Sequence, residues 1–145
     1  MSVSIADIRA GLVANLAESF DGYPISGYEM SDVKPPCFEV GFQLDRGIEF
    51  NAAMARGIDV YNLIVRGIVN ASPDIRAQEI LDEWCAPSGA TSVRAALEAD
   101  RTLGGVAQNL VVTDMSNYRA FAVPSKPNVT YLAAEWSVQV YAVGT

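Results

Sequence analysis

Histidine is absent from this sequence of 145 residues, and cysteine occurs only twice. Without histidine, neither a Ser-His-Asp nor a Cys-His catalytic arrangement can form, and metal sites that need an imidazole ligand are excluded. Cys37 and Cys85 are far apart in the chain and belong to no CxxC pair, so we expect neither a structural zinc nor a thioredoxin-type site. We expect each to be a small buried apolar side chain, with a disulfide or a reactive thiol as the alternatives.

Basic residues are scarce as well. Ten Lys and Arg stand against seventeen Asp and Glu, which gives a formal net charge of −7. Because affinity for nucleic acid comes largely from Lys and Arg that neutralise phosphates, this balance argues against sequence-specific binding of DNA or RNA as the main task. The sequence also lacks the pattern of a signal peptide and any run of about 18 apolar residues. We therefore expect a soluble protein, made in the cytosol, that does not enter a membrane.

The length and the apolar half of the composition fit one domain over residues 1–145, because neither a repeat nor a linker divides the chain. Ser4 and an apolar stripe at helical spacing predict a helix from Ser4 to Phe20. A weaker pattern predicts a short strand near residues 25–30. The other expected elements are strands over 37–45, 58–69, 109–123 and 128–143, a helix from Ser72-Pro73-Asp74 to about Ala86, and a short helix from Thr91 or Ser92.

This order of elements favours an α+β fold: a mixed or mainly antiparallel β-sheet flanked by α-helices. The last strand has the cleanest alternation and divides into two faces. We expect one face to be core, formed by Leu132, Ala134, Trp136, Val138 and Val140. The opposite face is the more polar one, formed by Tyr131, Glu135, Ser137, Gln139 and Tyr141.

The stretch "TSVRAALEADRTLGGVAQNLVV", residues 91–112, holds two acids, an Arg and a glycine pair in the break after a predicted helix. Glu98 and Asp100 point to different sides of a helix, and no His or Lys stands nearby to tune a general base. The glycines follow a helix, whereas a phosphate loop leads into one. We interpret the break as a joint in which Arg101 pairs with an acid and Gly104 or Gly105 stops the helix.

No other motif predicts catalysis, a cofactor or a metal. Asp45, Glu49 and Asp59 could together hold a hard cation, but their spacing lacks the pattern of a calcium loop, and we expect solvated charges. We expect Trp84 and Trp136 to be core residues. The sequence therefore predicts no catalytic, cofactor-binding or metal-binding residue.

A partner surface is the remaining type of site. Residues 46–57 follow neither period and are interpreted as a long hairpin connection, which we expect to be ordered by contact with neighbouring subunits. Two tyrosines stand on the polar face of the last strand. The candidate interface residues are Arg46, Ile48, Glu49, Phe50, Met54, Arg56, Tyr131 and Tyr141.

The segment from Gly57 to Ala142 resembles the tail-terminator, or tail-completion, proteins of long-tailed bacteriophages. The similarity lies in Ser72 to Leu81, in Ser88 to Gly105 and in Val129 to Ala142. Its most specific block is "SVRAALEADRTLGG". None of these positions is a known catalytic residue of that family. They look like positions that maintain the fold.

The resemblance implies a structural protein of the virion, located in the neck region of the tail and assembled in the host cytoplasm. It implies a ring of six copies that caps the tail tube, ends tube polymerisation and joins the tail to a head-neck connector or head-closure protein. DNA would pass through the lumen. Six copies would carry a formal charge of roughly −42, and an acidic lumen would let the DNA backbone slide without sticking. Two alternatives stay open: another ring of the neck, such as a head-closure protein, and a small-molecule-binding α+β domain.

Overall fold

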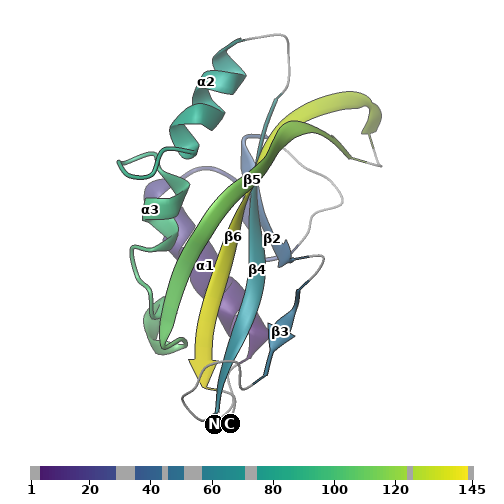
Figure 1. Ribbon diagram of the computed structural model, residues 1–145. Helices are drawn as coiled ribbons and strands as arrows, with labels where there is room; N and C mark the ends of the chain where they lie inside the picture. The colour runs from purple at the N-terminus through teal and green to yellow at the C-terminus, as the bar shows by residue number, and fades with distance from the viewer. Residues whose placement is uncertain are drawn as a thin grey trace.

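The computed structural model of the protein describes residues 4–28, 35–43, 46–50, 57–70, 75–123 and 126–143, without the side chains of 121–123, 126–130 and 143. It contains a mixed sheet of six strands, and α1, α2 and α3 pack on one face of this sheet (Figure 1). The expected α+β class is confirmed. The strands are β1 (Ile25–Ser26), β2 (Cys37–Phe42), β3 (Ile48–Glu49), β4 (Ile58–Asn70), β5 (Asn109–Val123) and β6 (Lys126–Val143).

Strand β4 lies at the centre of the sheet, whose order is β1-β2-β4-β6-β5, with β3 also paired to β4. Strand β6 pairs antiparallel with the whole of β4, from Ile58 opposite Val143 to Asn70 opposite Tyr131. On the other edge β2 pairs antiparallel with β4, and β1 adds to β2 in the parallel sense. Strand β4 is buried along nearly all of its length.

Residues 46–57 were expected to be a long hairpin connection ordered by neighbouring subunits, and this is wrong for its first part, because β3 pairs antiparallel with β4 of the same chain. Strand β2 reaches along β4 only to Leu63, which would leave the first backbone groups of β4 without partners. The chain returns to satisfy them, and the carbonyl of Gly47 accepts the N–H of Asn62 at 2.9 Å. The expected strand over residues 25–30 is likewise reduced to Ile25 and Ser26 in the part described.

The first helix, α1 (Ile5–Ser19), begins where the sequence predicts, with Ser4 as its N-cap. The hydroxyl of Ser4 accepts the N–H of Ala6 at 3.1 Å and so satisfies one of the free donors at the helix start. Ile8, Leu12 and Leu16 form the buried stripe. This stripe faces the sheet, and its three large aliphatic side chains belong to the main hydrophobic core.

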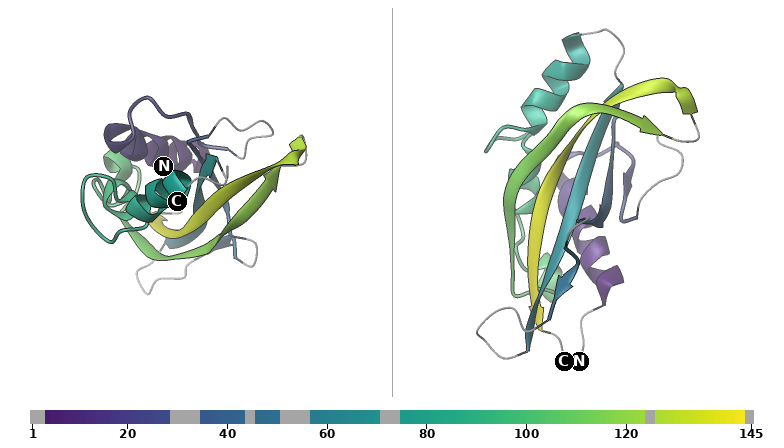
Figure 2. Two further views of the ribbon diagram at one scale, coloured as in Figure 1. Left: turned by 90° about the horizontal axis from the view of Figure 1, so that it is seen from above. Right: turned by 45° about the vertical axis from the view of Figure 1, so that its right-hand side comes forward.

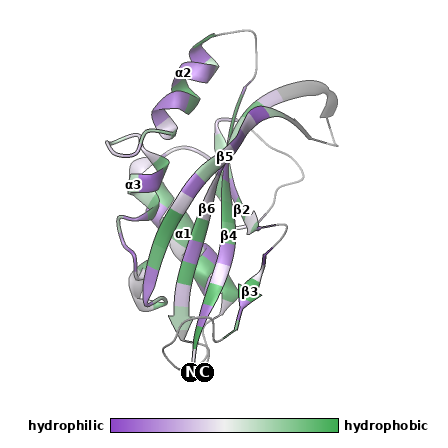
Figure 3. Ribbon diagram, viewed as in Figure 1, coloured by the Kyte–Doolittle hydropathy of each residue, from purple (hydrophilic) through white to green (hydrophobic). Residues whose placement is uncertain are grey.

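Two shorter helices follow β4. They are α2 (Ile75–Trp84), whose buried residues are Leu81 and Trp84, and α3 (Val93–Leu97), whose N-cap is Ser92. The alternation of polar and apolar segments along α2 is visible in Figure 3 and fits a helix with one buried side. The predicted start at Ser72-Pro73-Asp74 lies outside the described residues. No helix in the described ranges combines the length and the apolar character needed to cross a membrane.

The β5–β6 hairpin is longer than the sheet that supports it. Pairing between β4 and β6 ends at Tyr131, so among the described residues the first part of β6 and the last part of β5 pair only with each other. Both views in Figure 2 show this ribbon projecting away from the helices and from the rest of the sheet. Strand β5 is also an edge strand, and residues 113–120 are all exposed.

Three aromatic side chains meet over Gly67 in the middle of β4. A Cβ atom at Gly67 would lie 3.0 Å from Cε3 of Trp84, 3.1 Å from Cε1 of Phe38 and 3.1 Å from Cζ3 of Trp136. The rings of Phe38 and Trp84 are themselves in contact, with centroids 4.6 Å apart. A methyl group at this position would therefore press on all three rings, and both tryptophans are confirmed as core residues.

Replacing Gly67 with alanine should destabilise the protein by about 1–3 kcal/mol, because the added methyl overpacks a filled core. Gly47→Ala is the matched control, since nothing lies within 4 Å of a Cβ atom there, and it should change stability by no more than about 0.5 kcal/mol. Urea unfolding followed by fluorescence measures both. Equal stabilities of the two variants would contradict the packing around Gly67.

Trp136→Ala should lower the free energy of unfolding by about 3–5 kcal/mol, as large aromatic truncations in a core do. The side chain is buried between the sheet and the helices, as the alternation of the last strand predicts. Ile75→Ala is the control, because Ile75 is 70% exposed. A Trp136→Ala protein as stable as the Ile75→Ala protein would mean that the two faces of β6 are reversed.

Candidate interaction surfaces

The break after α3 is held together by Glu98. One oxygen of its carboxylate, Oε1, lies 3.6 Å from Nε of Arg94 and 3.3 Å from Nη2 of Arg101. The other oxygen, Oε2, accepts the backbone N–H of Val112 at 3.0 Å. Glu98 thus links the end of α3 to the edge of β5. The expected pairing of Arg101 with an acid is confirmed.

Asp100 shapes the turn that follows. Its carboxylate accepts the N–H and the hydroxyl of Thr102, at 3.0 and 2.7 Å, and the N–H of Gly104 at 2.9 Å. These bonds, with the Thr102 hydroxyl first, lower the pKa of Asp100 below its ordinary value. The predicted helix stop is displaced: α3 ends at Leu97, and the positive φ angles of Gly104 and Gly105 shape a separate 3₁₀ turn.

The joint is also tied to α1. Asn15 is buried, and its Nδ2 donates to the carbonyls of Leu97 and Asp100, both at 3.0 Å. Leu103 is buried directly against Gly11, where a Cβ atom would come within 2.7 Å of Cβ of Leu103. The stretch 91–112 is therefore a structural joint between α1, α3 and β5, and its charged groups are occupied in holding it.

The candidate interface residues around β3 are partly exposed. Arg46 and Glu49 are exposed, Ile48 is half-buried, and Phe50 is 71% exposed. Met54 and Arg56 lie outside the described residues, as does Asp45. Most of the phenyl ring of Phe50 is therefore in contact with water.

Glu49 and Tyr141, two of the candidates, belong to one hydrogen-bonded row on the sheet face without helices. The Tyr141 hydroxyl donates to Oε1 of Gln139 at 3.2 Å, and Nε2 of Gln139 donates to Oδ1 of Asn62 at 3.3 Å. Nδ2 of Asn62 donates to Oε2 of Glu49 at 3.1 Å. Asn62 is fully buried, so the row crosses β6, β4 and β3 with its central amide shielded from water. Its sequence signal was an asparagine in the middle of a strand that consists mostly of apolar residues.

Tyr131 does not lie on an exposed surface, contrary to its expected place on a polar face. It is 4% exposed and belongs to a small second core with Cys37, Ile68 and Ala133. Cys37 is buried as expected, whereas Cys85 is only half-buried. The polar face of β6 is therefore polar only from Glu135 onwards, because neighbouring strands place apolar residues beside Tyr131.

A charged cluster that the sequence reasoning missed lies next to this second core. Arg66 on β4 donates through Nη1 to Glu39 at 2.6 Å and through Nε and Nη2 to Glu135 at 2.9 and 2.5 Å. Nδ2 of Asn117 donates to the other oxygen of Glu135 at 2.5 Å. Burial alone would lower the pKa of Arg66, but the bonds to Glu135 and Glu39 outweigh it and raise that pKa. An arginine within an apolar strand was the available signal.

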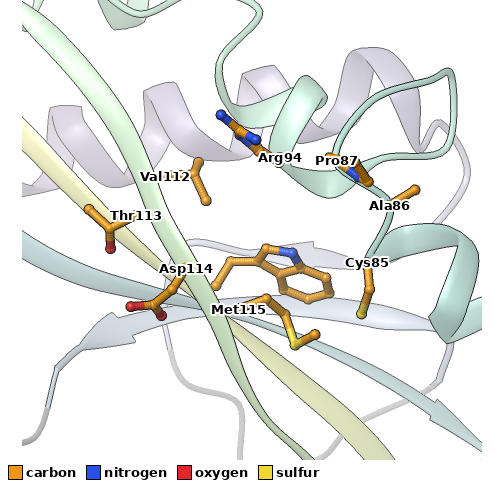
Figure 4. A pocket seen from close by; sticks show the side chains of 9 residues that line it. Cys85, Ala86, Pro87, Arg94, Val112, Thr113, Asp114 and Met115 are labelled. Atoms are coloured by element: carbon orange, nitrogen blue, oxygen red, sulfur yellow. The ribbon is translucent and has the colours of Figure 1, made fainter.

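A groove of about 240 Å³ runs beside the edge of β5. Figure 4 shows Thr113, Asp114 and Met115 on one side of it and Cys85, Ala86 and Pro87 on the other. Trp136 lies at its base and is almost completely buried, and Arg94 and Val112 complete the lining. The sequence did not reveal this groove because its residues come from α3, the α2–α3 connection, β5 and β6.

The groove does not have the chemistry of a catalytic thiol site. Burial, with a smaller effect of Asp82, raises the pKa of Cys85 to about 11, so its thiol is protonated at neutral pH and is a weak nucleophile. Within the described ranges, no group of His, Cys, Asp and Glu side chains could hold a metal ion.

No protein-family model and no curated protein matches the chain.

Asp100→Ala should reduce stability at about pH 6, and the deficit relative to the parent should shrink as the pH falls to about 2.5. The pKa of Asp100 is lowered by folding, so its contribution is complete above the ordinary aspartate pKa of about 3.9 and is lost as the pH falls through the lower, folded value. Thermal unfolding at several pH values measures the deficit. Asp21→Ala, an exposed control, should show little deficit at any pH; a deficit for Asp100→Ala that is constant with pH would contradict the assignment.

Proposed function

We propose that this protein is a tail terminator of a long-tailed bacteriophage. In this proposal, six copies form a ring that caps the tail tube, ends its polymerisation and joins it to the head-neck connector, with DNA passing through the lumen. The resemblance of residues 88–105 and 129–142 to such proteins supports it. Those two segments form the joint before β5 and most of β6, which together set the position of the projecting hairpin.

The observation that carries the proposal is the projecting β5–β6 ribbon. A two-stranded hairpin is at best marginally stable in water unless a third strand or another layer supports it. In the part of the chain that the structure describes, the residues of β6 before Tyr131 pair with β5 and with no third strand. Such a ribbon gains support when it lies against another protein. A ring of subunits on the end of a tube supplies neighbours both beside and below each copy.

The sheet face without helices is compatible with a lumen for DNA. Around Arg66 two carboxylates stand beside two guanidinium groups, because Arg119 lines the same hollow as Arg66 and Glu135, and the excess negative charge of this face comes from Glu49 in the neighbouring row. An acidic surface repels phosphates and reduces sticking, which suits DNA that must pass through. The formal net charge of the whole chain is also negative, at −7.

The groove beside β5 favours assembly over small-molecule binding. Ligand pockets typically enclose about 300–1,000 Å³ and have convergent polar groups, whereas this groove is smaller and is open along one side. Its main polar side chains are Thr113 and Asp114 on β5 and Arg94 on α3, and Arg94 is already paired with Glu98. A docked side chain from another protein fits this setting better.

The purified protein should have a mass in solution of about six times the 15.5 kDa chain and should appear in electron micrographs as a ring with a central hole. Added to the tail tube protein during polymerisation, it should shorten the tubes as its concentration rises and should be found at their ends. Light scattering and tube-length measurements test these two points. A ring that binds only the connector would identify a different neck protein, and a monomer that binds a small molecule would contradict the proposal.

A further inference from the structure

We propose that, within the ring, Phe50 of each subunit docks into the β5 groove of the next subunit, and that Arg46 pairs there with Asp114. This inference rests on the proposed ring and identifies the contact that would close it. The two surfaces lie on opposite sides of the sheet: Phe50 directly follows β3, on one side of β4, and the groove lies along β5, on the other side. A head-to-tail contact that closes a ring needs two different, complementary surfaces of this kind.

The shapes of the two surfaces match. Phe50 is 71% exposed, more than any other large apolar side chain whose exposure is described. A cavity of roughly 150 Å³ accommodates one benzene ring, so a groove of about 240 Å³ has room for a phenyl group. In the groove the phenyl ring would contact Met115, which is 37% exposed, and the more deeply buried Val112 and Trp136. The docked ring would cover both exposed apolar groups at once.

The charges of the two surfaces also match. Arg46 is exposed on the β3 side, and Asp114 is exposed on the rim of the groove. Among the described residues neither has an ion-pair partner within its own subunit. An arginine and a phenylalanine four positions apart would thus meet a carboxylate and an apolar groove. The opposite placement of charge also disfavours contact between two like surfaces.

The edge of β5 itself argues for side-chain docking over strand addition. Strand pairing is interrupted between Val112 and Asp114 and again between Ser116 and Arg119. The outward N–H of Val112 is already bonded to Glu98. Bulges and occupied donors of this kind prevent another strand from adding to an edge. The groove beside the irregularity at Val112 and Asp114 therefore remains as the contact site for a neighbouring subunit.

This contact also determines how the strands run in the ring. The groove lies about five residues, or roughly 17 Å, farther along β4 than Phe50, and three strand spacings, or roughly 14 Å, across the sheet. Rotation about the ring axis keeps the height of each atom unchanged, so Phe50 and the groove must lie at the same height. The strands must therefore be inclined to the ring axis, as strands are in closed barrels.

The test compares oligomer mass, by light scattering over a range of concentrations, for the parent, Phe50→Ala, Arg46→Asp, Asp114→Arg and the Arg46→Asp/Asp114→Arg double variant. All three sites are exposed, and circular dichroism checks that each variant is folded. We expect each single variant to raise the dissociation constant of the ring at least tenfold. The double variant should recover most of the loss, because the ion pair is restored with its charges exchanged. Ile75→Ala is the matched control for loss of an exposed apolar side chain and should assemble like the parent.

Each other outcome overturns the inference in a distinguishable way. Rings formed equally well by the parent and by Phe50→Ala and Asp114→Arg would place the interface elsewhere and leave the proposed function intact. Single charge variants that fail to assemble, and a double variant that fails too, would show that Arg46 and Asp114 do not meet. Intact rings of Asp114→Arg that no longer cap tubes would assign the groove to the tail tube protein. A parent that is monomeric at every concentration would overturn both proposals.

Discussion

The backbone of β4 crosses the middle of the protein with polar groups on both of its edges, and these groups cannot be left without partners in a buried strand. Strand β6 satisfies one edge along the full length of β4. Strand β2 satisfies much of the other edge, and the return of the chain through Gly47 and β3 satisfies the first residues. The position of Phe50 at the side of the sheet is a consequence of this requirement.

The two faces of β4 are covered in different ways. On the helical face Gly67 lets Phe38, Trp84 and Trp136 approach the backbone, and this aromatic packing joins α2 to the sheet. On the other face the strand carries Asn62, which is fully buried, and Arg66, which is partly buried; burial of these polar groups is tolerated because hydrogen-bond partners satisfy them. The same strand thus anchors an apolar core on one side and a polar surface on the other.

The charged joint between α3 and β5 shows how a sequence that resembles an active site can be structural. Arg101 pairs with Glu98, and the carboxylates of Glu98 and Asp100 also accept backbone N–H groups. The side chain of Asn15 on α1 donates to two backbone carbonyls of the same turn. The joint leads into the edge strand β5, and Glu98 of the joint accepts the outward backbone N–H of Val112. The groove that we propose as a docking site begins immediately beyond it.

The sequence alone determined the elements that depend on local chemistry: the N-cap at Ser4, the start of α3 to within one residue, the apolar stripe of α1, the alternation of β6 and the α+β class. These follow from side-chain period and capping, which act over a few residues. Only the tertiary structure decided the pairing of β3, the burial of Tyr131, the Arg66 cluster and the groove beside β5. Each depends on which residues of distant segments lie opposite one another, and a strand's own alternation cannot reveal whether its outer face meets water, an apolar neighbour or a matching charge.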